Sequence, residues 1–211
     1  MQTFVASGPK RSGTTLLNRL FDSHPEIIDF VDEGFFWEHV YKYDRQKAES
    51  LFVDLFHRFP AEALVQGFVE RDLLPWIEGE YRQVAVAEEF AKDLQFDTSL
   101  FQESLTKVHA QNTISEIWHF LVKAYADASH TSYFNRNKTF IKTGDAGRSI
   151  LAARKHLTKM RGIFIMRNPF YALDSLKKSR QIRQTKTMNP FTFGEALRHY
   201  HFFWNNIDDI I

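Results

Sequence analysis

Short apolar runs and longer helical stripes alternate along this chain. The short runs are rich in β-branched and aromatic residues, a composition typical of buried strands. They cover residues 3–6, 27–31, 139–142 and 162–166, where 27–31 is either a strand or an extended arm. Between them, apolar residues recur at helical spacing, for example at 16, 17, 20 and 21 on one predicted helix face. This order predicts parallel βαβ units in an α/β fold.

The middle of the chain, from about residue 44 to 135, has mostly helical patterns. Predicted helices cover 51–59, 61–74 and 98–111, and a fourth begins at Thr113, which forms a capping box with Glu116. This block is too apolar to be a solvated arm, so we expect a single domain over 1–211 with a helical insertion at about 44–135. The remaining predicted helices are 149–159 and a closing helix that starts at 192 and carries Trp204 on its apolar side.

Composition narrows the class of protein. The formal net charge of the 211 residues is +1, so no overall field favours nucleic acid. There is no cysteine, which excludes disulfides and thiolate metal sites. No apolar run is long enough to span a bilayer, and the first predicted strand begins too early to leave room for a signal peptide. We therefore expect a soluble cytoplasmic protein. The sequence does not determine its oligomeric state.

The loop after the first predicted strand carries the clearest chemistry. Residues 7–15 have the sequence Ser-Gly-Pro-Lys-Arg-Ser-Gly-Thr-Thr, with a strand before and a helix after. Such a glycine-rich turn presents backbone N–H groups and a helix N-terminus, which together bind anions. Nucleotide triphosphatases continue the second glycine with Lys-Ser/Thr, whereas here Thr14 follows and the basic residues Lys10 and Arg11 lie inside the loop. The pattern therefore favours a phosphate donor other than ATP with Mg²⁺.

The residues at the end of strand 162–166 are predicted to bind a second anionic group of the ligand. Arg167 follows that strand, and the carboxyl ends of parallel strands are where α/β sheets bind ligands. Asn168 is a good helix N-cap, and Pro169 suits the first helical position. An arginine at this place, instead of an aspartate, favours an anion over a metal ion. Ser175 follows eight residues after Arg167 in the same predicted helix.

Together these segments resemble the sulfotransferases that use 3′-phosphoadenosine 5′-phosphosulfate (PAPS). Residues 8–17, Gly-Pro-Lys-Arg-Ser-Gly-Thr-Thr-Leu-Leu, with His-Pro-Glu-Ile at 24–27, resemble the 5′-phosphosulfate loop of that family. Residues 165–169, Ile-Met-Arg-Asn-Pro, with Ser175, resemble its 3′-phosphate motif. The carbohydrate- and tyrosylprotein-type branch is most similar. The resemblance implies a three-layer P-loop-like fold, with PAPS as donor and 3′-phosphoadenosine 5′-phosphate (PAP) as product.

The resemblance also implies roles for particular residues. Arg11, with Lys10 as a second cation, would stabilise the charge that develops during transfer. Glu33 would be the general base, with Asp32 and His39 as alternatives. No metal is expected. The residues implied in binding the nucleotide are Gly8, Pro9, Lys10, Arg11, Ser12, Gly13, Thr14, Thr15, Arg167 and Ser175.

Two departures from the family pattern keep other functions open. The loop has two adjacent basic residues where most members have one. No glycine follows Gly194 and the chain ends soon after the closing helix, so the C-terminal segment of relatives is not expected here. The acceptor would be a hydroxyl or amine of a small molecule, carbohydrate or peptide. The alternatives are a small-molecule kinase with an atypical phosphate loop and a non-catalytic PAP-binding protein.

Overall fold

The structure is a computed structural model, and it describes residues 1–9, 12–21, 24–33, 36–49, 96–108, 112–129, 136–145, 147–172, 174–175 and 193–210. Strands and helices alternate in the first and last thirds of the chain. The elements are β1 Gln2–Ser7, α1 Thr14–Phe21, β2 Ile27–Glu33, α2 Phe36–Glu49, α7 Thr98–Leu105, α8 Ile114–Ala128, β3 Lys138–Thr143, α9 Arg148–His156, β4 Met160–Phe164, α11 Phe193–Asn205 and α12 Ile207–Ile210. The predicted helices at 51–59 and 61–74 lie outside the described residues.

The four strands form one parallel sheet in the order β2-β3-β1-β4. This confirms the predicted α/β class, and residues 27–31 belong to a strand and not to an extended arm. The last strand begins and ends two residues earlier than predicted, because its pairing with β1 runs from Met160, opposite Thr3, to Phe164, opposite Ser7, where β1 ends. Arg167 therefore follows β4 after a short irregular segment and does not end the strand.

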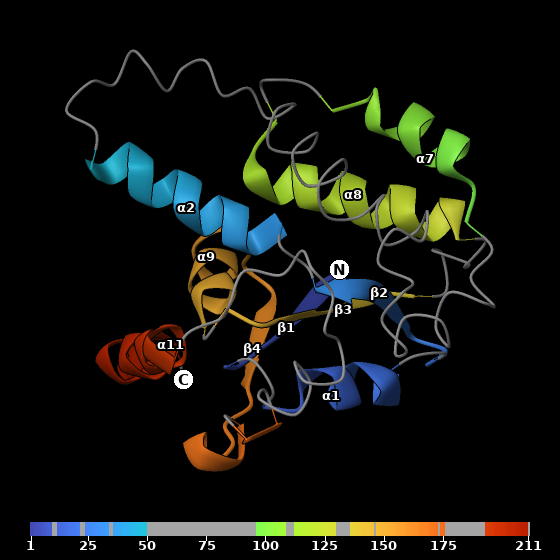
Figure 1. Cartoon of the computed structure of the whole chain (residues 1–211). Helices are drawn as coiled ribbons and strands as arrows, with labels where there is room; N and C mark the ends of the chain where they lie inside the picture. The colour runs from blue at the N-terminus through green and yellow to red at the C-terminus, as the bar shows by residue number, and fades with distance from the viewer. Residues whose placement is uncertain are drawn as a thin grey trace, which may run out of the picture.

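Helices cover both faces of the sheet (Figure 1). On one face, Leu17 and Phe21 of α1 pack with Ala6 and Phe140. On the other face, α2, α8 and α9 enclose the main core, which includes alternate residues of the same strands, such as Val5. This arrangement follows from the alternation of side chains along each strand, which sends neighbouring residues to opposite faces.

Aromatic side chains fill the main core. Trp118 of α8 stacks on Phe30 with ring centroids 5.4 Å apart, and Phe30 stacks on Tyr125 at 4.4 Å. The Trp118 ring nitrogen donates to the Thr3 hydroxyl at 3.0 Å, so α8 is joined directly to the central strand. Trp37 is fully buried, and its ring centroid lies 5.2 Å from that of Trp118. Helix α8, which lies within the predicted helical insertion, therefore contributes to the core on this face of the sheet.

The capping box at the start of α8 is confirmed. Thr113 accepts from the Glu116 backbone amide at 3.2 Å, and the Glu116 carboxylate accepts from the Thr113 amide at 2.7 Å. Helix α7 ends at Leu105 and not at 111, because the Thr106 hydroxyl bonds to the Glu103 carbonyl within a turn. Helix α9 likewise ends before 159, since the chain turns extended at residue 157 to enter β4.

The predicted apolar face of α1 is confirmed for Leu17 and Phe21 and wrong for Leu16 and Leu20. Leu16 and Leu20 are 65% and 69% exposed, although the sequence pattern placed them on the buried face. The buried side of the helix instead includes Leu17 and Phe21 together with Asn18, whose amide donates to the Asp29 carboxylate. A polar residue is accommodated on this face because it has a partner on β2. Trp204 is also 57% exposed, in contrast to its predicted place on the apolar side of the closing helix.

Helices α2 and α9 are joined by a charged group of three side chains. Asp44 of α2 lies 2.8 Å from His156 Nε2 and 3.0 Å from Lys155 Nζ. Burial raises the pKa of Asp44, but the hydrogen bonds and charges of both partners lower it by more, so it falls below the ordinary 3.8.

None of the helices in the described ranges has the length and apolar character needed to cross a membrane.

Candidate functional site

Strands β1 and β3 are neighbours in the sheet, and the connections that follow them run to opposite faces. After β1 the chain enters α1 on one face, and after β3 it enters α9 on the other. In open parallel sheets, a crevice forms at the carboxyl ends of two such strands, and ligands bind there. The loop at 8–13 follows β1 at this place. The candidate site is therefore built on the carboxyl edge of the sheet, around β1.

Backbone hydrogen bonds form a turn in the loop, and α1 follows directly after it. The Ser12 amide donates to the Pro9 carbonyl at 3.0 Å, which forms a tight turn. Gly13 has a φ of 113°, a conformation that a residue with a side chain adopts only with strain. Its carbonyl accepts from Leu16 and Leu17, so the helix begins immediately after it. The first amides of a helix have no partner inside the helix, so this end of α1 attracts negative charge.

One feature of the loop fits an anionic ligand, and a second shows how closely the loop packs against the segment after β4. The Ser12 Oγ is buried and has no hydrogen-bond partner among the described residues. Because a buried hydroxyl without a partner costs free energy, such an atom marks a place where a ligand or water would bind. Gly8 has no room for a side chain: an added Cβ would lie 2.3 Å from the Ile165 carbonyl oxygen and 2.5 Å from Ser12 Oγ.

The segment after β4 lies against this loop. The Ile165 amide donates to the Ser7 carbonyl at 2.8 Å, which continues the β1–β4 pairing up to the start of the loop. Two residues later, the Arg167 carbonyl accepts from the Tyr200 hydroxyl at 3.1 Å. Burial raises the pKa of Tyr200 above its ordinary 10.0, so this hydroxyl keeps its proton at neutral pH. Helix α11 thereby anchors the backbone at Arg167.

A short helix follows, as the sequence predicts. The Asn168 side chain accepts from the Phe170 amide at 3.0 Å, and the Asn168 carbonyl accepts from Ala172 at 3.1 Å, which confirms the N-cap. Residues 169–172 and 174–175 are helical, so Pro169 occupies the first helical position and Ser175 lies about two turns further on. Arg167 is exposed at the start of this segment.

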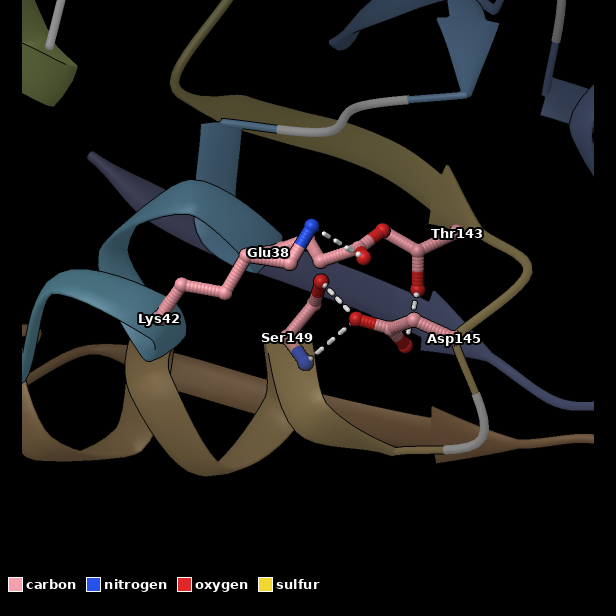
Figure 2. A network of polar contacts seen from close by, with 5 residues as sticks. All are labelled: Glu38, Lys42, Thr143, Asp145 and Ser149. Atoms are coloured by element: carbon pink, nitrogen blue, oxygen red, sulfur yellow. Dashed lines mark hydrogen bonds and ion pairs between the residues drawn. The ribbon is translucent and has the colours of Figure 1, made fainter. Parts of the chain in front are cut away.

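A buried carboxylate lies at the end of β3, next to the loop. Asp145 accepts from the hydroxyls of Ser7 at 2.7 Å and Thr143 at 2.9 Å with one oxygen. Its other oxygen accepts from the Ser149 amide at 2.8 Å and from the Ser149 hydroxyl. The Gly147 amide donates to Ser7 Oγ at 2.7 Å. Protein donors therefore occupy both oxygens of Asp145 (Figure 2).

A charged pair on α2 lies beside this network. Lys42 Nζ is 2.8 Å from a Glu38 carboxylate oxygen, and the Glu38 side chain is 18% exposed. Figure 2 shows the Glu38 carboxylate directed toward Thr143. Glu38 is thus a further carboxylate at the carboxyl edge of the sheet.

The residues proposed as general base are only partly described. Asp32 and Glu33 are the last two residues of β2, and the Glu33 backbone lies opposite Lys142 of β3 after an irregularity in the register. Glu33 is therefore at the same edge of the sheet as the loop, two strands away from it. His39 is half-buried in α2. The side chains of Asp32 and Glu33 lie outside the described residues.

Most of the predicted nucleotide-binding residues come together at this edge. Pro9, Thr14 and Thr15 complete the described part of the loop and the first turn of α1, with Thr14 buried. Lys10 and Arg11 lie outside the described residues. Sequence reasoning missed the role of Asp145, although a carboxylate two residues after a buried strand is a signal for this edge. In the part of the chain that the structure describes, no group of three or more histidine, aspartate or glutamate side chains is arranged to hold a metal ion.

Comparison with known proteins assigns neither a family nor a function to the chain. The chain matches no protein-family model, no curated protein and no solved structure. A function for this chain is therefore inferred from its own residues and from their geometry.

Proposed function

We propose that this chain is a PAPS-dependent sulfotransferase with a P-loop-like fold. The observation that carries the proposal is the contact between two segments that are far apart in sequence. Ser7 and Gly8, at the start of the phosphosulfate-like loop, pack against Ile165, at the start of the 3′-phosphate-like motif. A nucleotide with a phosphate at each end of its ribose requires two anion sites of this kind within one ligand length of each other.

The described residues fit such a donor. The 5′-phosphosulfate would lie on the loop, where the Ser12 hydroxyl lacks a protein partner in the described structure and α1 begins. Gly8 allows the loop to pack directly against Ile165, because no side chain projects from it. The 3′-phosphate would be held by Arg167, which supplies positive charge and a planar fork, and by the hydroxyl of Ser175.

When bound, PAPS would supply an activated sulfuryl group. The chain's own residues would stabilise the developing charge and take the proton from the acceptor. Arg11 and Lys10 are placed by the family resemblance where charge grows on the oxygens during transfer, and fixed cations stabilise such charge. Glu33 would take the proton from the acceptor hydroxyl, since its strand ends at the same edge as the loop.

The Asp145 network disfavours the kinase alternative. In nucleotide triphosphatases, an aspartate at the end of a strand helps to hold Mg²⁺. Here the carboxylate beside the loop strand already accepts hydrogen bonds from Ser7, Thr143 and Ser149, so its oxygens are not turned toward a ligand. Metal binding at Asp145 would require these bonds to break.

Calorimetric titration with PAP, AMP and ATP plus Mg²⁺ tests the proposal. We expect PAP to bind best, and AMP to bind at least about tenfold more weakly because it lacks the 3′-phosphate. Transfer from labelled PAPS is then measured against a panel of small phenols, carbohydrates, tyrosyl peptides and amines. Preference for ATP with Mg²⁺ would support the kinase instead. Tight PAP binding without transfer to any acceptor class would support a binding protein.

A further inference from the structure

The Asp145 network connects three elements that meet beside the loop. Its hydroxyl donors are Ser7 at the end of β1, Thr143 at the end of β3 and Ser149 in the first turn of α9. Ser7, Thr143, Asp145 and Ser149 are all at most 3% exposed. Hydrogen bonds to a buried carboxylate are among the strongest in proteins, because the acceptor is charged and water does not compete.

Ser7 is held from two sides immediately before the loop. Its hydroxyl donates to Asp145 and accepts from the Gly147 amide, both at 2.7 Å, so the orientation of the hydroxyl is fixed. Its carbonyl accepts from Ile165 on the opposite side of β1. The next residue, Gly8, packs so closely against Ile165 that a side chain in its place would meet the Ile165 carbonyl oxygen. The direction in which the backbone enters the loop is thus set by these bonds.

We infer that Asp145 is a positioning residue, which acts through Ser7 to hold the first residues of the loop in the conformation that receives the phosphosulfate. This inference rests on the proposed function for the identity of the ligand. The ordering of the loop, however, is a property of the ligand-free protein and is measured separately.

A matched pair of hydroxyl deletions tests the inference. Ser7→Ala and Ser149→Ala each remove one buried hydroxyl donor from Asp145 and leave its carboxylate in place, and Ser7→Ala also removes the acceptor of the Gly147 amide. Only Ser7 adjoins the loop. Hydrogen–deuterium exchange of the ligand-free variants is followed in peptides that cover residues 4–17 and 147–156. We expect Ser7→Ala to speed exchange in the first peptide about tenfold, and Ser149→Ala to act only on the second.

PAP affinity gives the second readout. We expect Ser7→Ala to weaken PAP binding about tenfold, while Ser149→Ala changes it less than about twofold. Equal effects of both variants on the loop peptide, or an unchanged loop peptide in Ser7→Ala, would overturn the inference. If the unaltered protein does not bind PAP, the proposed function fails, whereas the exchange comparison still decides whether Asp145 orders the loop. The hydroxyl deletions are preferred to Asp145→Asn because the asparagine amide would face the Ser149 amide and strain the fold.

Discussion

Replacing Gly8 by alanine should damage both the fold and the proposed nucleotide site. The added Cβ would lie 2.3 Å from the Ile165 carbonyl oxygen, whereas ordinary contacts begin at 3.4 Å, so loop and β4 segment must separate by about 1 Å. Overpacking of this kind costs about 1–3 kcal/mol. The Ile165–Ser7 hydrogen bond of 2.8 Å would be stretched at the same time, which costs about 1 kcal/mol more. We therefore expect the free energy of unfolding to fall by about 2–4 kcal/mol.

The same displacement would separate the two proposed anion sites. If one charge-assisted contact to PAP is lost, affinity should fall roughly ten- to a hundredfold. Urea unfolding measures the first effect and calorimetric titration with PAP the second. Gly162→Ala is the matched control, because its Cβ would lie 2.8 Å from a methyl group of Ile150, a side chain of the main core. This control should lose about 1–2 kcal/mol of stability with PAP affinity unchanged within about twofold.

Two results would refute this reasoning. One is a Gly8→Ala protein that binds PAP as tightly as the unaltered chain, since the two segments would then not need their observed contact. The other is a Gly162→Ala protein that loses as much affinity as Gly8→Ala, since the loss would then reflect general destabilisation.

Four further predictions concern other parts of the molecule. Arg167→Ala should weaken PAP binding roughly ten- to a hundredfold in calorimetry and leave AMP binding unchanged, and a parallel loss for both ligands would place the 3′-phosphate elsewhere. Glu33→Gln should lower turnover with labelled PAPS by roughly two to four powers of ten while PAP still binds; if Asp32→Asn does so instead, Asp32 is the base. The pKa of Asp44 is lower in the folded than in the unfolded chain, so its stabilisation is present above about pH 4 and is lost as the pH falls through the folded value. Urea unfolding from about pH 2 to 6 should therefore show a shallower loss for Asp44→Asn, and superimposable curves would contradict this. Thr113→Ala should lower the free energy of unfolding by about 1 kcal/mol through loss of the helix cap, measured by urea unfolding, whereas Thr113→Ser should retain most of it.

Local patterns predicted those features that depend on neighbouring residues. The strands at the beginning and middle of the chain, the capping box at Thr113 and the N-cap at Asn168 follow from residue types a few positions apart. The glycine-rich turn before α1 is of the same kind. For the caps and the turn, the hydrogen bonds that stabilise the feature form within a few residues of it, so the local sequence contains the cause. The strands were recognised from their residue types alone, although their hydrogen bonds go to distant strands.

Features that depend on distant partners were predicted less well. The end of β4 is set by the end of β1 at Ser7, which no pattern near residue 164 contains. The buried side of α1 includes Asn18 because Asp29 lies across from it on β2. Asp145 is part of the site because Ser7, far away in sequence, donates to it. These outcomes are determined by tertiary contacts, which override local periodicity.

The central position of β1 affects when the protein can fold during its synthesis. Strand β1 leaves the ribosome before both of its partners, β3, where Gln2 lies opposite Lys138, and β4, where Thr3 lies opposite Met160. At about 5–20 residues per second, translation needs roughly 8–30 seconds to supply both partners. Until then, both edges of β1 lack their native hydrogen bonds, and unpaired edges favour association with other chains. The loop that follows β1 is thus synthesised well before β3 and β4, and it acquires its native surroundings only after both of these strands have been made.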